Sequence, residues 1–257
     1  MAGVRLERDG ATAWLIVDRP EARNALDSAA MDEIERLLAE AAEWDWCHAL
    51  FMRGAGDRVF VAGGDLKELE SVRSAEYAYE LALRMRRTLD RIPDLPMPVV
   101  AGLNGHAIGG GAELAVACDY RVMAAGARIG FTQARLGLMP AWGGIERLVT
   151  LAGRGRALLM LTTGEEYSAE AAQGLGLIEE VVASERFEAR LQELAERLAE
   201  VPRQALAGIK RAAAAAQAYA RPELEAGAAR DFAAAWVAPD HWTALERAVE
   251  RRRSART

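Results

Sequence analysis

The sequence predicts an α/β fold followed by a helical C-terminal module, and three observations support this prediction. Two apolar runs, residues 11–17 and 49–52, flank a segment whose apolar residues recur at helical spacing, which indicates a β-helix-β unit with parallel strands. A glycine-rich loop joins a further apolar run to a second helical segment. After Ser184, long runs of Ala, Leu and Arg show no strand pattern. We therefore predict a core over residues 1–183 and a helical module over residues 184–257.

The individual elements are justified in chain order. Asp27 and Ser28 can cap the first helix. Its apolar positions are Met31, Ile34, Leu37, Leu38 and Ala41. An apolar strand ends at Val59 and Phe60, and further strands are expected at 98–103, 121–124 and 181–182. Helices are expected at 112–118, 143–152, 155–161 and 169–173. In the C-terminal module three or four helices are expected, separated at Pro202, Pro222 and Pro239.

Composition and charge favour a globular protein and disfavour a nucleic-acid partner and a metal site. With 51% hydrophobic and 27% charged residues among 257, the chain can bury a sizeable core. A formal net charge of −6 disfavours nucleic acid as a partner. The two cysteines, Cys47 and Cys118, have no CxxC spacing and the three histidines lie far apart, which favours a reducing cytoplasm and no metal site.

No segment reads as a targeting or membrane element. The N-terminal residues are charged and include no apolar run, unlike a signal peptide. The longest charge-free stretch, residues 95–112, holds two prolines and five glycines, so it predicts an interior strand and loop rather than a membrane span. We expect a cytoplasmic protein with no membrane partner.

Glu113 stands at the end of a loop that contains three consecutive glycines, residues 109–111. Glycines let the backbone turn with its amides exposed, and the start of a helix adds a partial positive charge, which suits a developing oxyanion. A partly buried carboxylate at this place could have a raised pKa and act as a general acid or base. The same residues also fit a structural role, in which the glycines permit close packing and Glu113 favours the helix start.

A second glycine turn, within residues 61–68, follows an apolar strand end and precedes a helical run. Its amides could supply the other half of a two-donor site. Taken alone this signal is weak, because a Gly-Gly-Asp turn that caps a helix is common. Neither loop matches a P-loop or a dinucleotide-binding fingerprint, and no GxSxG, HExxH or Cys/His nucleophile pattern occurs.

Together and in this order, the two loops resemble those of the enoyl-CoA hydratase/isomerase (crotonase) superfamily, over about residues 4–253. Four ordered blocks carry the resemblance: residues 19–26 (RPEARNAL), 62–67 (AGGDLK), 109–119 (GGGAELAVACD), and 136–140 (LGLMP) with Gly143 and Gly144. The resemblance implies a spiral of ββα turns and a helical C-terminus that builds homotrimers, which can pair into hexamers. It also implies an enzyme of fatty-acid metabolism that acts on an acyl-CoA thioester, with CoA as part of the substrate and no other cofactor.

The resemblance also implies roles for particular residues. The backbone amides of Gly64 and Gly110 would hold the thioester oxygen, and Glu113 would move the proton. The adenine and phosphates of CoA would be gripped near Arg23 and Lys67, for which plain solvated charges are the alternative. The residues implied for CoA and substrate binding are Ala22, Arg23, Ala62, Asp65, Leu66, Lys67 and Trp142.

Two positions depart from the family pattern. Gln133 stands where typical hydratases have a second glutamate, and because glutamine can orient a water but cannot ionise, hydration would rest on Glu113. Double-bond isomerases lean on that missing glutamate and are disfavoured. Trp142 stands where small residues are common, and residues 140–144 resemble those of short-chain malonyl-type decarboxylases, which act on methylmalonyl-CoA or ethylmalonyl-CoA.

The leading hypothesis is a hydratase that adds water syn to a 2-enoyl-CoA through an enolate held in an oxyanion hole. Decarboxylation of a malonyl-type CoA ester is the rival enzymatic hypothesis. A non-catalytic acyl-CoA binder or an RNA binder of the same fold is the alternative from another class. The acidic net charge disfavours RNA, and the presence of Glu113 disfavours an inactive site.

Overall fold

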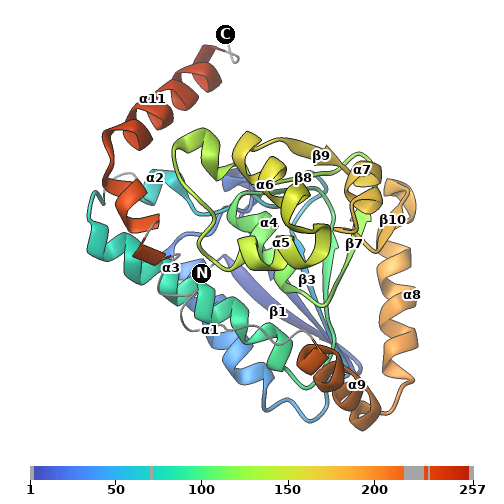
Figure 1. Ribbon diagram of the computed structural model, residues 1–257. Helices are drawn as coiled ribbons and strands as arrows, with labels where there is room; N and C mark the ends of the chain where they lie inside the picture. Colours follow the sequence, from blue (N-terminus) through green and yellow to red (C-terminus); the bar gives the residue numbers. More distant parts are fainter. Residues whose placement is uncertain (1–2, 70–71, 217–228, 231, 255–257) are drawn as a thin grey trace.

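A computed structural model describes residues 3–69, 72–216, 229–230 and 232–254, and it contains two sheets (Figure 1). The larger sheet has the strand order β1-β2-β3-β5-β7-β10. Its strands are β1 (Val4–Asp9), β2 (Thr12–Val17), β3 (Ala49–Gly54), β5 (Val99–Leu103), β7 (Tyr120–Ala124) and β10 (Glu180–Val182). β1 and β2 pair antiparallel, and the other neighbours run parallel.

The smaller sheet has the order β4-β6-β8-β9, with each strand three residues long. Its strands are β4 (Val59–Val61), β6 (His106–Ile108), β8 (Arg128–Gly130) and β9 (Glu166–Ser168). β4, β6 and β8 run parallel, while β8 and β9 pair antiparallel. This sheet positions the site, because both glycine turns follow directly after its strands: one after β4 and the other after β6.

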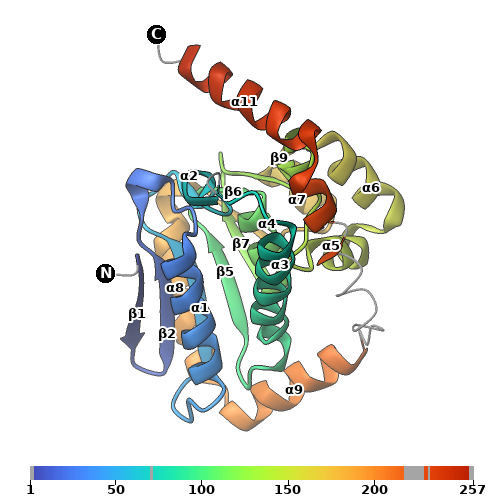
Figure 2. The same cartoon turned by 90° about the vertical axis from the view of Figure 1, so that its left-hand side faces the viewer.

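Helices cover both faces of the larger sheet (Figures 1 and 2). On one face α1 (Ser28–Ala41), α3 (Ala75–Asp90) and α4 (Gly110–Ala117) share the main hydrophobic core. On the other face Phe187 and Leu191 of α8 (Phe187–Ala199) pack against Trp14 and Phe51 of the sheet. The inner strands β2, β3, β5 and β7 are therefore buried on both sides, as their apolar sequences predict.

The remaining elements are short helices and the C-terminal helices. They are η1 (Pro20–Ala22), α2 (Leu66–Leu69), η2 (Ile92–Asp94), η3 (Thr132–Leu136), α5 (Gly144–Ala152), α6 (Arg154–Thr163), α7 (Ala169–Gly174), η4 (Ser184–Arg186), α9 (Arg203–Ala216) and α11 (Pro239–Ser254). Residues 229–230 and 232–237 are also helical. α11 extends away from the rest of the molecule in both views (Figures 1 and 2). No helix in the described ranges is long and apolar enough to cross a membrane.

Most of the predicted elements are confirmed. β2, α1 and β3 form the predicted parallel β-helix-β unit, and Asp27 is the N-cap of α1, where its side chain accepts from the amide of Ala30 at 2.8 Å. α9 begins directly after Pro202, and Pro239 begins α11. Pro222 lies outside the described residues. In the part of the chain after Ser184 that the structure describes, the residues form helices and no strand, as predicted.

Several elements differ from the prediction for identifiable reasons. α4 begins at Gly110 rather than at residue 112, and α5 begins at Gly144 rather than at 143. β1 was not predicted, because it is an edge strand whose charged residues are exposed. β6, β8 and β9 were missed because three residues are too few to show an alternating pattern. α3 was also missed.

Candidate active site

The two glycine turns lie against each other at the start of α4. Gly63 has a φ of +92°, and a Cβ added to it would lie 3.1 Å from the amide nitrogen of Gly110. A Cβ added to Gly111 would overlap the carbonyl group of Val61. Only glycine adopts the backbone conformation of Gly63 freely, and only glycine leaves room for the contact between Gly111 and Val61. These glycines therefore allow the two turns to approach each other closely.

In each turn, one main-chain N–H group points away from the strand or helix to which it belongs. Leu26 donates to the carbonyl of Gly63 and accepts from the amide of Asp65, each at 2.8 Å. In this parallel bridge the N–H of Gly64 points to the side opposite Leu26. Gly110 is the first residue of α4, so its N–H has no acceptor within the helix. Both N–H groups therefore point away from the hydrogen bonds of their own elements, and their role as donors to a thioester oxygen stays a prediction.

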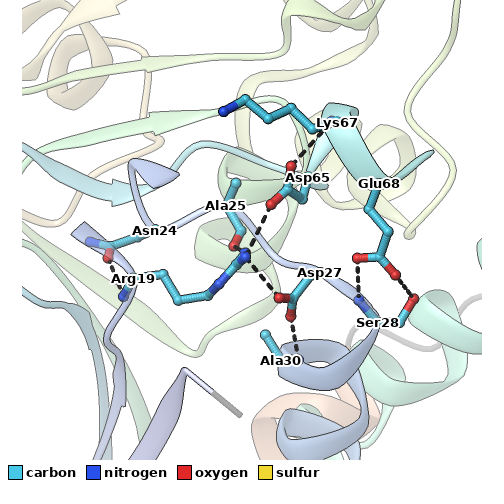
Figure 3. A network of polar contacts seen from close by, with 9 residues as sticks. All are labelled: Arg19, Asn24, Ala25, Asp27, Ser28, Ala30, Asp65, Lys67 and Glu68. Carbon is cyan, nitrogen blue, oxygen red and sulfur yellow. Dashed lines mark hydrogen bonds and ion pairs between the residues drawn. The ribbon is translucent and has the colours of Figure 1, made fainter. Parts of the chain in front are cut away.

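Arg19 ties the first turn to the start of α1 (Figure 3). Its guanidinium pairs with Asp65 at 3.1 Å and with Asp27 at 2.7 Å, and it also donates to the carbonyl of Ala25. The Arg19 side chain is 16% exposed, so this is a largely buried junction. The junction connects the segment 19–26 to the segment 62–67 through a single side chain.

The residues predicted to bind CoA lie on these two segments but in different surroundings. The ammonium of Lys67 extends away from Asp65 and Glu68, and the side chain is exposed (Figure 3). Arg23, which is exposed and has a φ of +58°, lines a cavity of about 800 Å³ whose described lining does not include Lys67. The other predicted contacts are half-buried: Ala22, Ala62, Asp65 and Leu66.

Glu113 is buried in the first turn of α4, with 2% of its surface exposed. Its Oε1 accepts from the amide of Trp142 at 2.8 Å and from the amide of Gly144 at 3.0 Å. Its Oε2 accepts from Nε2 of Gln133 at 3.0 Å. Burial raises the pKa of Glu113 to about 7, and the two amides and the charge of Arg147 oppose that rise. A carboxyl group with this pKa can both take and return a proton near neutral pH.

Gln133, in η3, lies beside both Glu113 and the second glycine turn. A Cβ added to Gly109 would lie 4.0 Å from its Nε2, so the amide covers the start of that turn. Its Oε1 is buried and has no hydrogen-bond partner. This oxygen can accept a hydrogen bond from a water that also reaches Glu113, but the amide cannot ionise.

The turn before α5 supplies the indole ring of Trp142 and the two main-chain amides that donate to Glu113. Trp142 is 6% exposed, and a Cβ added to Gly110 would lie 2.6 Å from its ring atom Cη2, so the indole packs directly against the proposed donor residue. A Cβ added to Gly144 would lie 2.5 Å from Cγ of Glu113. Gly144 therefore has to be glycine for the carboxylate to fit.

Sequence reasoning missed two kinds of site residue. The amides of Trp142 and Gly144 were not expected as partners of Glu113, although the Gly143-Gly144 pair was a visible signal. Arg19 and Arg147 were not predicted as supports, because partners distant in sequence leave no local pattern. Both cysteines are free and buried, and among the described residues no group of three or more potential ligands is placed to hold a metal ion.

Comparison with known proteins agrees with this geometry. Residues 7–254 match the family model described as "Enoyl-CoA hydratase/isomerase". The chain is 33% identical over 195 residues to a short-chain-enoyl-CoA hydratase of Clostridium acetobutylicum, covering 76% of this chain and 74% of that protein. It is 33% identical over 174 residues to an ethylmalonyl-CoA decarboxylase of Xenopus laevis, covering 68% and 58%. A crystal structure of an enoyl-CoA hydratase from Bacillus anthracis superposes with a TM-score of 0.81 and 30% identity, covering 97% and 96%.

Proposed function

The chain belongs to the enoyl-CoA hydratase/isomerase family, and we propose that it hydrates a 2-enoyl-CoA with Glu113 as the proton-transferring group. The observation that carries this proposal is the environment of Glu113: one carboxylate oxygen is held by two main-chain amides and the other faces an amide that cannot compete for a proton. The pKa of about 7 leaves a substantial ionised fraction at neutral pH.

The proposed reaction uses groups on both glycine turns. The amides of Gly64 and Gly110 receive the thioester oxygen, and each such donor contributes about 3 kcal/mol toward the enolate-like transition state. A water that donates to Oε1 of Gln133 and also reaches the carboxylate of Glu113 attacks C3 of the enoyl group. As its oxygen bonds to C3, the electrons of the double bond move toward the thioester oxygen and Glu113 takes the proton. Glu113 then returns that proton to C2 on the same face, which completes a syn addition.

The substitution Glu113→Gln tests this role. It keeps an oxygen that can accept from the Trp142 and Gly144 amides, but it removes the proton carrier. We expect kcat to fall on the order of 10³-fold while the affinity for a saturated acyl-CoA is retained. The matched control is Glu40→Gln on the surface of α1, which should leave turnover unchanged. Unchanged turnover in the Glu113 variant would contradict the assignment.

Decarboxylation of a malonyl-type CoA ester is the second candidate, favoured by Gln133, by Trp142 and by the similarity to an ethylmalonyl-CoA decarboxylase. In that reaction the bond between the carboxylate carbon and Cα breaks, carbon dioxide leaves, and the electron pair forms an enolate held by the same amides. Protonated Glu113 would then donate to Cα. Both reactions share the oxyanion site, so only the substrate distinguishes them.

Absorbance at the enone band of a short 2-enoyl-CoA, measured for the wild type and for Gln133→Glu in parallel, distinguishes the two reactions. Rapid loss in the wild type supports hydration by a single glutamate. If absorbance is lost only with the variant, or with neither protein, and the wild type releases carbon dioxide from ethylmalonyl-CoA, the result supports decarboxylation. Gln173→Glu, at an exposed glutamine, is the matched control. Binding of acyl-CoA or RNA without either turnover would support a non-catalytic binder.

Assembly and location form part of the same proposal. The family resemblance supports a homotrimer or a pair of trimers, which sedimentation or light scattering measures directly. Cysteine usage favours a cytoplasmic location, which cell fractionation tests. Because the proposed step draws only on Glu113 and on amides, exhaustive dialysis against a chelator should leave the rate unchanged.

A further inference from the structure

A largely buried arginine lies directly behind the turn that holds Glu113. Arg147, in α5, is 13% exposed and folds back beneath residues 142–144. Its Nη1 donates to the carbonyl of Trp142 at 3.0 Å, and its Nη2 pairs with Asp90, the last residue of α3, at 2.6 Å. α3 is thus connected through this arginine to the turn beside the site.

Trp142 is held at both its polar main-chain groups. Its amide donates to Glu113 and its carbonyl accepts from Arg147. Gly143, which follows, has a φ of +90°, and a Cβ there would overlap Nη1 of Arg147. Gly144 then supplies the second amide to Glu113. The guanidinium therefore fixes, from behind, the short segment whose two amides aim the carboxylate.

We propose that Arg147 is a positioning residue of the reaction: by holding the Trp142 carbonyl it aims the two amides that bind Glu113, and Asp90 keeps Arg147 in place. The inference rests on the proposed function, because it takes Glu113 as the proton-transferring group. The hydrogen bonds of Arg147 go to Trp142 and Asp90, so it acts on Glu113 indirectly.

Arg147 and its partner Asp90 lie beside a second pair of opposite charges, Arg86 and Glu146. Arg86 pairs with Glu146 at 2.7 Å and approaches Asp90 at 3.5 Å, so two guanidinium groups face two carboxylates. Arg147 and Glu146 act on Glu113 directly, Arg147 lowering its pKa and Glu146 raising it. Arg86 and Asp90 act on Arg147. Loss of Arg147 leaves Glu113 facing a net negative set, whereas loss of the Asp90 charge leaves it facing a net positive one.

The test compares Arg147→Met, Arg147→Lys and Asp90→Asn. For Arg147→Met we expect kcat to fall 10- to 100-fold with little change in KM. The pKa of Glu113, followed by carbon-13 NMR of labelled glutamate against Glu113→Gln, should rise. Asp90→Asn should lower kcat less and move the same pKa downward. Arg147→Lys keeps the charge but loses the two-donor geometry, so the pKa should return toward the wild type while kcat stays reduced.

Arg121→Met is the matched control for removing a buried arginine. Arg121 is 2% exposed, donates to the carbonyls of Leu177 and Cys118, and pairs with Glu179. It should cost stability without changing kcat or the pKa of Glu113. An unchanged kcat and pKa in Arg147→Met, or the same losses in Arg121→Met, would overturn the proposal. Since the NMR readout does not require turnover, it separates failure of the positioning role from failure of the hydratase assignment.

Discussion

The two glycine turns of the site both lead into a carboxylate, and the two carboxylates are held in opposite ways. Asp65, after Gly63 and Gly64, pairs with the guanidinium of Arg19. Glu113, after Gly110 and Gly111, is bound by amides only. The guanidinium of Arg19 fixes the position of the Asp65 carboxylate. Burial raises the pKa of Glu113 to about 7, so its carboxyl group can exchange a proton near neutral pH.

The difference extends to how each turn is built. The first turn is held by two main-chain hydrogen bonds with Leu26 and also by the Arg19 side chain, which pairs with Asp65 and with Asp27 at the start of α1. The second turn is held by main-chain contact: Gly111 lies against the Val61 carbonyl, and no side chain could be accommodated there. We infer that the first turn relies partly on the ion pairs of Arg19, while the second turn relies on close main-chain approach.

The largest effect is expected from a methyl group placed in the second turn. In Gly111→Ala the new Cβ would overlap main-chain atoms of Val61, which cannot move aside as a flexible side chain could. We expect a loss of about 3 kcal/mol or more in the free energy of unfolding, together with loss of activity. Urea unfolding followed by circular dichroism measures the first.

The control for that substitution is Gly155→Ala in α6, where an added Cβ meets nothing within 4 Å. Alanine at a compatible helical position should raise stability by about 0.5–1 kcal/mol. If both variants unfold at the same urea concentration, the second turn does not depend on close main-chain approach.

The pH dependence of stability should separate the two carboxylates. Folding raises the pKa of Glu113 from 4.5 to about 7, so the folded state binds this proton more tightly than the unfolded state does. The resulting stabilisation of the fold is fully present below pH 4.5 and is lost as the pH rises through 7. Glutamine does not titrate, so Glu113→Gln avoids this loss. Between pH 4 and pH 8, the free energy of unfolding of the variant should increase relative to that of the wild type by up to about 3 kcal/mol. Asp65→Asn, which breaks a largely buried ion pair, should instead destabilise at pH 8. A difference for Glu113→Gln that does not vary between pH 4 and 8 would contradict the raised pKa.

The part of the site that could be predicted from sequence is the part that glycine requirements and local order specify. Gly64, Gly110 and Glu113 lie in turns between a strand and a helix, as expected, because such a turn constrains its residues locally. The parallel unit of β2, α1 and β3 was likewise visible in the spacing of apolar residues. Whether the two amides bind a thioester oxygen stays a prediction.

The remainder could not be predicted, because it depends on contacts between distant segments. Arg19 reaches Asp65 across 46 positions, and Arg147 reaches Asp90 across 57. An arginine in such a place looks the same in the sequence as one on the surface. The short strands β6, β8 and β9 of the smaller sheet were not predicted for a different reason: they are defined by pairing rather than by their own sequence pattern.

A smaller effect is expected when the clamp of the first turn is removed. Arg19→Met leaves Asp65 and Asp27 without their shared cation, which should lower the free energy of unfolding by about 1–3 kcal/mol and kcat/KM by about tenfold. Arg5→Met, at an exposed arginine paired with Asp18, is the control and should change neither quantity appreciably. Equal behaviour of the two variants would show that the first turn is held by its main chain, as the second turn is.

The smallest effect is expected at the exposed charges. Lys67→Met should raise KM for an acyl-CoA about two- to fivefold without changing kcat, because an exposed ammonium contributes weakly to binding a phosphate. The effect should disappear with an N-acetylcysteamine thioester, which lacks the nucleotide, and at high ionic strength. Arg23→Met, on the separate 800 Å³ cavity, provides the comparison, and Arg36→Met on the exposed face of α1 is the control. A rise in KM for Arg23→Met but not for Lys67→Met would place the nucleotide at that cavity, and the first turn would then contribute only its amide.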